Sequence, residues 1–199
     1  MGTRPMSTGD EIGESTIVMQ SEAMQVHLRR MAREIAKAHP RMESLVLLGI
    51  LRRGKPLAER LARLLGGMTG HTPPVGALAT TLYRDDLALT GNDSKGYTHF
   101  DFEVDGRSVL LVDDVLAKGR TIRAAMDEVF HYGRPARIQL ACLIDRGGRE
   151  LPIRADYLGE KIPAGEDEWI RVRLNEIDGE DVVLVERMPG IETSGEAQA

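Results

Sequence analysis

The sequence is short of cysteine and of long apolar runs, and each shortage excludes a class of protein. Its one cysteine, Cys142, cannot form an internal disulfide and lies in the apolar run 138–144. No apolar run approaches the roughly 20 residues that a membrane-spanning helix needs. The polar segment 1–14 also lacks the apolar stretch of a signal peptide. We therefore expect a cytoplasmic protein without a membrane span.

An excess of positive charge is also missing, which argues weakly against a nucleic-acid-binding protein. The 199 residues carry a formal net charge of −5. The excess acid lies near the C-terminus, where residues 176–199 hold seven carboxylates against Arg187 alone. The rest of the chain is therefore close to neutral, and a local basic surface remains compatible with its composition.

One segment combines a buried strand, an acidic pair and a small polar loop. The apolar run 109–112 predicts a strand of a parallel sheet, Asp113 and Asp114 follow it, and a helical pattern begins near Thr121. A helix N-terminus favours phosphate because unpaired N–H groups lie there, and Gly119 lets the loop amides turn toward one anion. Carboxylates accept hydrogen bonds from ribose hydroxyls or hold hydrated Mg²⁺. The segment therefore predicts a site for a phosphorylated sugar.

Apolar runs alternate with helical patterns elsewhere, which indicates an α/β domain with a mainly parallel sheet. The expected strands are residues 16–20, 44–50, 75–83, 109–112, 137–144, 169–174 and 181–185, the last two joined by a hairpin at Asp178-Gly179. The expected helices run from Ser21 to about Ala38, from Gly54 to the pair Gly66-Gly67, and from Thr121 to Phe130. Ligands of such folds bind at the carboxyl ends of strands, so the loops after residues 50, 112 and 144 should converge.

Three further segments have a predicted place. Arg52, Arg53 and Gly54 follow a strand and suit an anion, since arginine offers forked donors and glycine permits unusual backbone geometry. The polar excursion that begins at Arg84 has the length of a lid over a site. Segments 1–14 and 189–199 are expected to be disordered tails around one domain, residues 15–188.

Several motifs of the chain occur together in known proteins. The string of four apolar residues, two acids and, further on, Gly-Arg-Thr resembles the PRPP-binding motif of type I phosphoribosyltransferases. The runs 81–86, 133–135 and 138–140, and above all the run from Asp145 to Tyr157, resemble the PyrR family of pyrimidine operon regulators and uracil phosphoribosyltransferases. This resemblance covers roughly residues 16–187. It implies the type I phosphoribosyltransferase fold, with a mainly parallel central sheet flanked by helices, a mobile loop and a small hood.

The resemblance also implies an activity, partners and residues that serve them. Uracil and PRPP would give UMP and pyrophosphate with Mg²⁺ held near the acidic pair through PRPP and water, and leader RNA of the pyrimidine operon would bind when UMP is present, promoting attenuation. A homodimer or higher assembly is implied as well. The implied catalytic residues are Asp113, Asp114 and Arg84, and the implied phosphate site is Val115, Leu116, Ala117, Lys118, Gly119, Arg120 and Thr121. Pyrophosphate would contact Arg52, Arg53 and Gly54, uracil would contact Asp145, Arg146 and Gly147, and RNA would contact Arg29, Arg30, Arg33, Arg149, Arg154 and Lys161.

Departures from the family pattern leave alternatives open. Ala117 and Lys118 stand where the family has Tyr-Thr, which favours a nucleotide-sensing RNA regulator with little activity as one alternative. Gly148 replaces a usual histidine, and Glu160 places a negative charge where RNA phosphates would bind, which favours an enzyme without RNA binding. Another type I phosphoribosyltransferase is the remaining alternative, although Ala117 lacks the Asp that purine enzymes often carry there.

Overall fold

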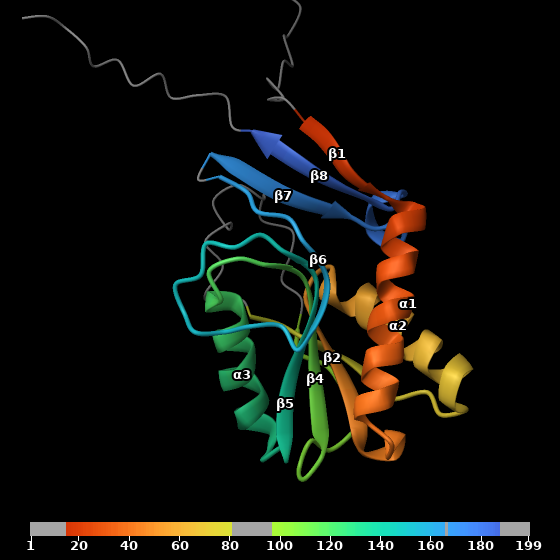
Figure 1. The fold of residues 1–199 in the computed structure, drawn as a ribbon. Coiled ribbons are helices and arrows are strands. Elements are labelled where there is room, and N and C mark those ends of the chain that lie inside the picture. The colour runs from red at the N-terminus through yellow and green to blue at the C-terminus, as the bar shows by residue number, and fades with distance from the viewer. Residues whose placement is uncertain (1–14, 81–96, 166, 188–199) are drawn as a thin grey trace, which may run out of the picture.

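The computed structural model describes residues 15–80, 97–165 and 167–187 and arranges most of them in three layers, with a smaller sheet beyond one end (Figure 1). The strands are β1 (Ser15–Gln20), β2 (Leu45–Ile50), β3 (Val75–Leu78), β4 (Ser108–Leu116), β5 (Arg137–Asp145), β6 (Tyr157–Lys161), β7 (Glu168–Arg173) and β8 (Val182–Arg187). The helices are α1 (Ser21–Ala38), α2 (Gly54–Thr69), α3 (Arg120–Tyr132) and the short α4 (Asn175–Asp178), with a 3₁₀ turn at Met42–Ser44.

The central sheet confirms the predicted parallel architecture. Its five strands run in the order β3-β2-β4-β5-β6, and each neighbouring pair is parallel. The strands are apolar on both faces because each face is covered: Leu47 and Leu110 pack in one core cluster with α1 and α2, whereas Leu48 and Leu111 pack in another with α3. Within the described ranges, no helix is both long and apolar enough to cross a bilayer.

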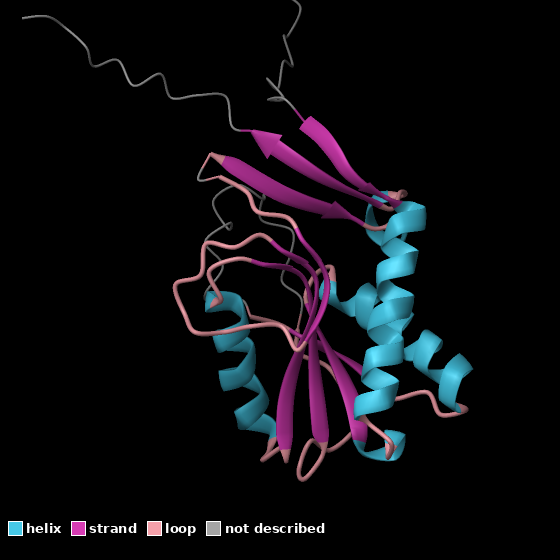
Figure 2. Ribbon diagram, viewed as in Figure 1, coloured by secondary structure: helices cyan, strands magenta, loops and turns pink. Residues whose placement is uncertain are grey.

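The second sheet is the small hood that the family resemblance implied. Its strands run antiparallel in the order β1-β8-β7. It lies beyond the carboxyl ends of the parallel strands, so the loops that leave β2, β4 and β5 point toward it (Figures 1 and 2). The first strand of the chain and the last two strands form the hood. The loops after β2, β4 and β5 therefore lie between the two sheets.

Several element boundaries differ from the sequence expectation. Helix α2 continues through Gly66 and Gly67 to Thr69. Gly70, with a φ of 77°, follows as its left-handed C-cap. Strand β4 includes both acids and extends to Leu116. The turn between β7 and β8 is the helical turn α4 followed by Gly179, not a tight hairpin. Strand β6 was not predicted, and the predicted strand 75–83 ends at residue 78 within the described residues.

Candidate active site

The loops after β2, β4 and β5 lie next to one another because these three strands are adjacent and parallel. At the end of β4, Leu116 is in register with Asp145 at the end of β5. The amide of Arg146 donates to the Leu116 carbonyl at 3.1 Å. The predicted phosphate loop and the predicted base-binding loop therefore begin at the same place, as expected for parallel strands.

The phosphate loop ends in the N-terminus of α3. Gly119 is the N-cap of α3 and has a φ of 93°, a left-handed conformation that glycine adopts without strain. Arg120 and Thr121 open the helix, and its first turn contains no acidic residue. The N–H groups at the start of a helix and the helix dipole favour an anion at this position.

The two acids at the end of β4 differ in exposure. Asp113 is only 7% exposed, and one of its oxygens accepts from the Asp114 amide at 3.0 Å. Asp114 is half-buried, and its Oδ1 accepts from the Val115 amide at 3.0 Å. Cys142 of β5 is in register with Asp113 of β4. Burial, reinforced by the two carboxylates, raises the pKa of its thiol. Cys142 is thus a buried neutral group beneath the acids rather than a nucleophile.

The side chain of Arg149 connects the base loop to the phosphate loop. Its guanidinium pairs with Asp145 at 2.5 Å and donates to the carbonyls of Leu116 and Ala117. Its Nε donates to the Ile153 carbonyl at 3.0 Å. Its side chain is only 22% exposed, so these contacts hold it between the two loops rather than on an open surface. The geometry therefore gives Arg149 a positioning role that the RNA-contact expectation did not include.

Both cations of the phosphate loop contact a carboxylate that sequence reasoning missed. Glu150 lies 3.2 Å from Lys118 and 2.6 Å from Arg120. The hydrogen bonds from Lys118 and Arg120 lower the pKa of Glu150. The amide of Glu150 also donates to the Lys118 carbonyl at 3.1 Å. A phosphate bound at this loop would therefore share Lys118 and Arg120 with Glu150, or displace Glu150 from them.

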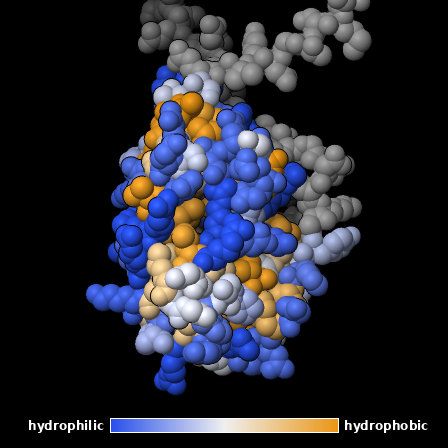
Figure 3. All heavy atoms as spheres, turned by 90° about the vertical axis from the view of Figure 1, so that its right-hand side faces the viewer, coloured by the Kyte–Doolittle hydropathy of each residue, from blue (hydrophilic) through white to orange (hydrophobic). Residues whose placement is uncertain are grey.

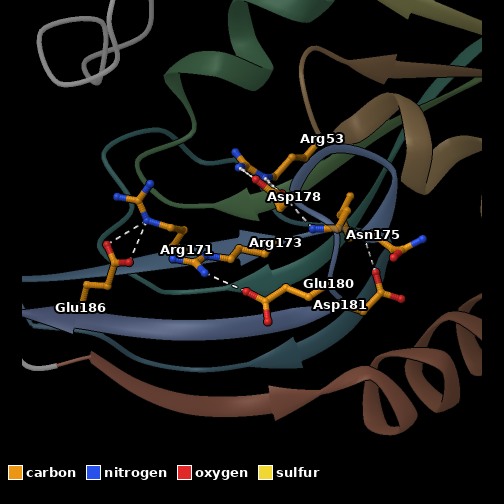
Figure 4. Close-up of polar contacts among 9 residues, drawn as sticks. Arg53, Arg171, Arg173, Asn175, Asp178, Glu180, Asp181 and Glu186 are labelled. Carbon is orange, nitrogen blue, oxygen red and sulfur yellow. Dashed lines mark hydrogen bonds and ion pairs between the residues drawn. The ribbon is translucent and has the colours of Figure 1, made fainter.

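The predicted pyrophosphate loop approaches β4 closely and is tied to the hood. A side chain on Gly54 would place its Cβ 2.2 Å from the Val112 carbonyl oxygen. Glycine is therefore required because the start of α2 lies directly against β4, and not for unusual backbone geometry. Arg53 pairs with Asp178 of α4 at 2.8 and 3.2 Å, a two-pronged contact that Figure 4 displays. Arg52 is exposed. Of the two predicted pyrophosphate arginines, one is thus held by the hood.

The hood also contacts the base loop through the only tryptophan of the chain. The guanidinium carbon of Arg146 lies 5.9 Å from the centre of the Trp169 ring, and the same side chain donates to the Gly165 carbonyl at 2.9 Å. Its Nε is buried without a hydrogen-bond partner among the described residues. Gly147 has a φ of 79°, and its amide donates to Asp145 at 2.9 Å. Trp169 and Asp178 gave no local sequence signal, since their roles depend on the hood's position.

The predicted RNA-contacting residues fall into two groups. Arg29 and Arg33 are exposed on α1, and Arg154 and Lys161 are exposed around β6. Arg30, in contrast, donates to the carbonyls of Leu158 and Gly159 at 2.8 and 2.5 Å and thereby joins α1 to β6.

Other predicted residues have a less direct placement. Glu160, the departure noted above, lies 3.3 Å from His27 of α1. Arg84 and the rest of the run 81–86 lie outside the described residues.

Comparison with known proteins agrees with this arrangement. The phosphoribosyl transferase domain model matches residues 15–174. The "Bifunctional protein PyrR" of Pelotomaculum thermopropionicum is 49% identical over 86% of this chain and 96% of its own, and that of Thermus thermophilus is 47% identical over 83% and 92%.

Solved structures support the fold. The hypoxanthine phosphoribosyltransferase of Trypanosoma cruzi matches with a TM-score of 0.64 at 20% identity, covering 86% of this chain and 96% of that one. A hypoxanthine-guanine phosphoribosyltransferase of Bacillus anthracis matches with a TM-score of 0.66 at 21% identity, covering 89% and 100%. At these identities the structures show the fold and not the base that is used. The relatives and the domain match decide the family: this chain belongs to the PyrR family of phosphoribosyltransferase-fold proteins.

Proposed function

We propose that this protein transfers the phosphoribosyl group of PRPP to uracil, and that it binds leader RNA of the pyrimidine operon when UMP is present. The observation that carries the enzymatic half is the joined pair of loops at the ends of β4 and β5, which Arg149 connects through Asp145 and the Leu116 carbonyl. One loop offers a helix N-terminus to a phosphate and the other lies beside it, where the base would be. The bifunctional relatives support both halves.

The residues have distinct roles in the proposed reaction. The amides and side chains of residues 115–121 hold the 5′-phosphate, and Asp113 with Asp114 accept hydrogen bonds from the ribose hydroxyls. Residues 52–54 contact the pyrophosphate. Residues 145–147 border the uracil. The buried Nε of Arg146 has no acceptor among the described residues and is a donor that the base could use. This arrangement orients the two substrates, which is a large part of the catalysis we propose.

The bond between the anomeric carbon and a pyrophosphate oxygen breaks, a bond to a uracil ring nitrogen forms, and that nitrogen loses its proton. Positive charge develops on the ribose during this displacement. The carboxylates of Asp113 and Asp114 lie at the end of β4, where they stabilise that charge in a partly buried setting.

Two adjacent carboxylates fit a hydrated Mg²⁺ that is shared with PRPP. Carboxylate oxygens are ligands that Mg²⁺ accepts, directly or through its bound waters. When bound, Mg²⁺ neutralises charge on the departing pyrophosphate. Asp113 and Asp114 are the residues that would hold it, through water. PRPP and the transcript are cytoplasmic, and we propose that compartment for the protein.

The test of the enzymatic half is the formation of UMP from labelled uracil, PRPP and Mg²⁺. We expect turnover, and we expect Asp114→Asn to reduce it about 100-fold by weakening charge stabilisation at the ribose. No UMP above background would leave an RNA regulator with little activity, which the pairing of Lys118 with Glu150 favours as the second candidate. Use of hypoxanthine in place of uracil would refute the assigned base.

The regulatory half is tested by binding to the leader transcript with and without UMP. We expect UMP to strengthen binding, and we expect affinity to fall steeply with salt because phosphate contacts release counterions. Equal affinity for a scrambled RNA of the same length would refute sequence-specific regulation. That result would leave an enzyme without the regulatory role, the candidate favoured by Glu160 on the α1 side of β6.

A further inference from the structure

Between α1 and α2 lies a hollow of about 480 Å³ that the transfer site does not use. Leu28 and Leu64 give it apolar walls, and Arg29 and Arg63 line it from opposite helices. Figure 3 views the side of the molecule that carries these helices and shows hydrophilic side chains interleaved with apolar ones. Two guanidinium groups that line one hollow from opposite helices suit an anion such as phosphate, because each can donate paired hydrogen bonds to its oxygens.

The acid in this hollow is already neutralised. Asp181 accepts from Nη2 and Nη1 of Arg60 at 2.6 and 2.9 Å, and Glu176 accepts from Nε and Nη2 of the same side chain. Arg29 donates only to the neutral amide oxygen of Gln25, at 2.9 Å. Arg63 has no hydrogen bond or ion pair with any described residue. Two cations of the hollow therefore have no carboxylate partner among the residues that the structure describes.

The positive surface continues beyond the hollow along α1. Arg29, Arg33 and Lys37 follow at intervals of four residues, which places them on one side of the helix about 6 Å apart along its axis. All three side chains are exposed. A row of cations that leads out of an anion-sized hollow suits a chain of phosphates better than a single free anion.

The opposite side of α1 is less suited to a polyanion. There Arg30 is engaged with backbone carbonyls of β6, and His27 contacts Glu160. Charge of both signs meets on that side, whereas Arg29 and Arg63, which line the hollow, have no carboxylate partner within the described ranges. The more favourable approach for a phosphate backbone is therefore over the α1–α2 groove.

We propose that this groove binds the backbone of the RNA, with one phosphate seated in the hollow between Arg29 and Arg63. This assignment rests on the proposed regulatory function and extends its surface onto α2. Arginine is suited to the role because its planar guanidinium donates two parallel hydrogen bonds to phosphate oxygens. Arg33 and Lys37 hold the neighbouring phosphates along α1.

The test compares Arg63→Gln with Arg134→Gln, which removes the same charge from the exposed turn after α3, at the end of that helix away from the phosphate loop. Affinity for the leader transcript is measured with UMP over a series of salt concentrations. We expect Arg63→Gln to weaken binding about tenfold, the usual worth of one charge-assisted hydrogen bond. Its slope of log affinity against log salt should be smaller by about 0.7 to 0.9 because one phosphate contact is lost. Arg134→Gln should change neither, and melting temperatures verify that both variants fold.

The possible outcomes separate the groove from the function on which it rests. If the unaltered protein binds the leader and both variants match it, or both weaken equally, the groove assignment is wrong and RNA binding stands. If the unaltered protein does not distinguish the leader from scrambled RNA, the regulatory function is wrong and the groove assignment falls with it. Arg29→Gln should match Arg63→Gln, and the double variant should be less than additive because both residues hold one phosphate. Arg63-dependent binding of inorganic phosphate with no effect of Arg63→Gln on RNA would assign the hollow to a free anion instead.

Discussion

At the scale of single residues, the site is defined by arginines whose partners lie far away in the sequence. Arg149 holds two loops together, Arg53 reaches the hood, and Arg60 neutralises two acids. The sequence predicted Arg53 as an anion-binding residue because it follows a strand and stands beside a glycine, whereas RNA contact by Arg149 was implied only by the family resemblance. It could not identify the carboxylates, since a partner 125 residues away, as for Arg53 and Asp178, leaves no local pattern.

Glu150 provides the first prediction at this scale. It contacts both Lys118 and Arg120, so it would compete with a PRPP phosphate at the proposed site for the cations of the loop. Glu150→Gln should lower the KM for PRPP about two- to fivefold, the range that an exposed ion pair is worth. Steady-state kinetics with uracil in excess measures the change, and Glu103→Gln, an exposed acid outside the loop, is the matched control. A higher KM would mean instead that Glu150 orders the loop for phosphate.

At the scale of elements, the sequence predicts whatever depends on local periodicity. The apolar stripe of α1 was predicted from its spacing, and Met24, Leu28, Met31 and Ile35 are all buried. Strand β6 was missed because its stability comes from packing: a Cβ on Gly159 would lie 2.3 Å from the Leu143 carbonyl oxygen, so only glycine lets β6 approach β5. Helix α2 passes through Gly66 for a similar reason, since a Cβ there would lie 2.1 Å from the Thr72 hydroxyl. Close approach between elements is the information that a local pattern lacks.

The attachment of the hood to α2 gives an element-scale prediction. Arg60 is 13% exposed and contacts Glu176 at 2.5 Å and Asp181 at 2.6 Å. Arg60→Gln would leave two partly buried carboxylates without their cation, and we expect a loss of about 3 kcal/mol in the free energy of unfolding. Urea denaturation measures it. Arg63→Gln, one turn further along α2 on its exposed side, should change stability by less than about 0.5 kcal/mol. Equal effects of the two substitutions would refute the role of Arg60 as an anchor.

At the scale of the whole molecule, a parallel sheet and a hood are joined by a shared apolar cluster, which includes Val172 and Val183 of the hood, and by ion pairs between α2 and α4. Figure 4 shows the hood side of this junction, where Arg53 meets Asp178 and the amide of Asn175 donates to Asp181. The Arg60 hydrogen bond lowers the pKa of Glu176. Burial alone would raise the pKa of Asp178, but hydrogen bonds from Arg53 and the Leu174 amide outweigh it and leave the value lowered. The junction therefore depends on carboxylates that are more acidic in the folded state than in the unfolded state.

This dependence predicts that acid separates the hood from the core before the core unfolds. In the folded protein the pKa values of both carboxyls lie below their ordinary values, 4.5 for Glu176 and 3.8 for Asp178. The stabilisation that the ionised carboxylates give to the folded state is therefore complete above about pH 5 and is lost as the pH falls toward the folded pKa values. Trp169 lies in the hood against Arg146 and is the only tryptophan, so its fluorescence reports this contact. Between pH 5 and pH 3, its emission should change at a higher pH than the far-ultraviolet circular dichroism. In the double variant Arg53→Gln/Arg60→Gln, the emission should already be altered at pH 7, because both cations of the junction are absent. Coincident transitions in the unaltered protein would mean that hood and core unfold as one unit, with the apolar contacts of β1 and β7 rather than the ion pairs holding them together.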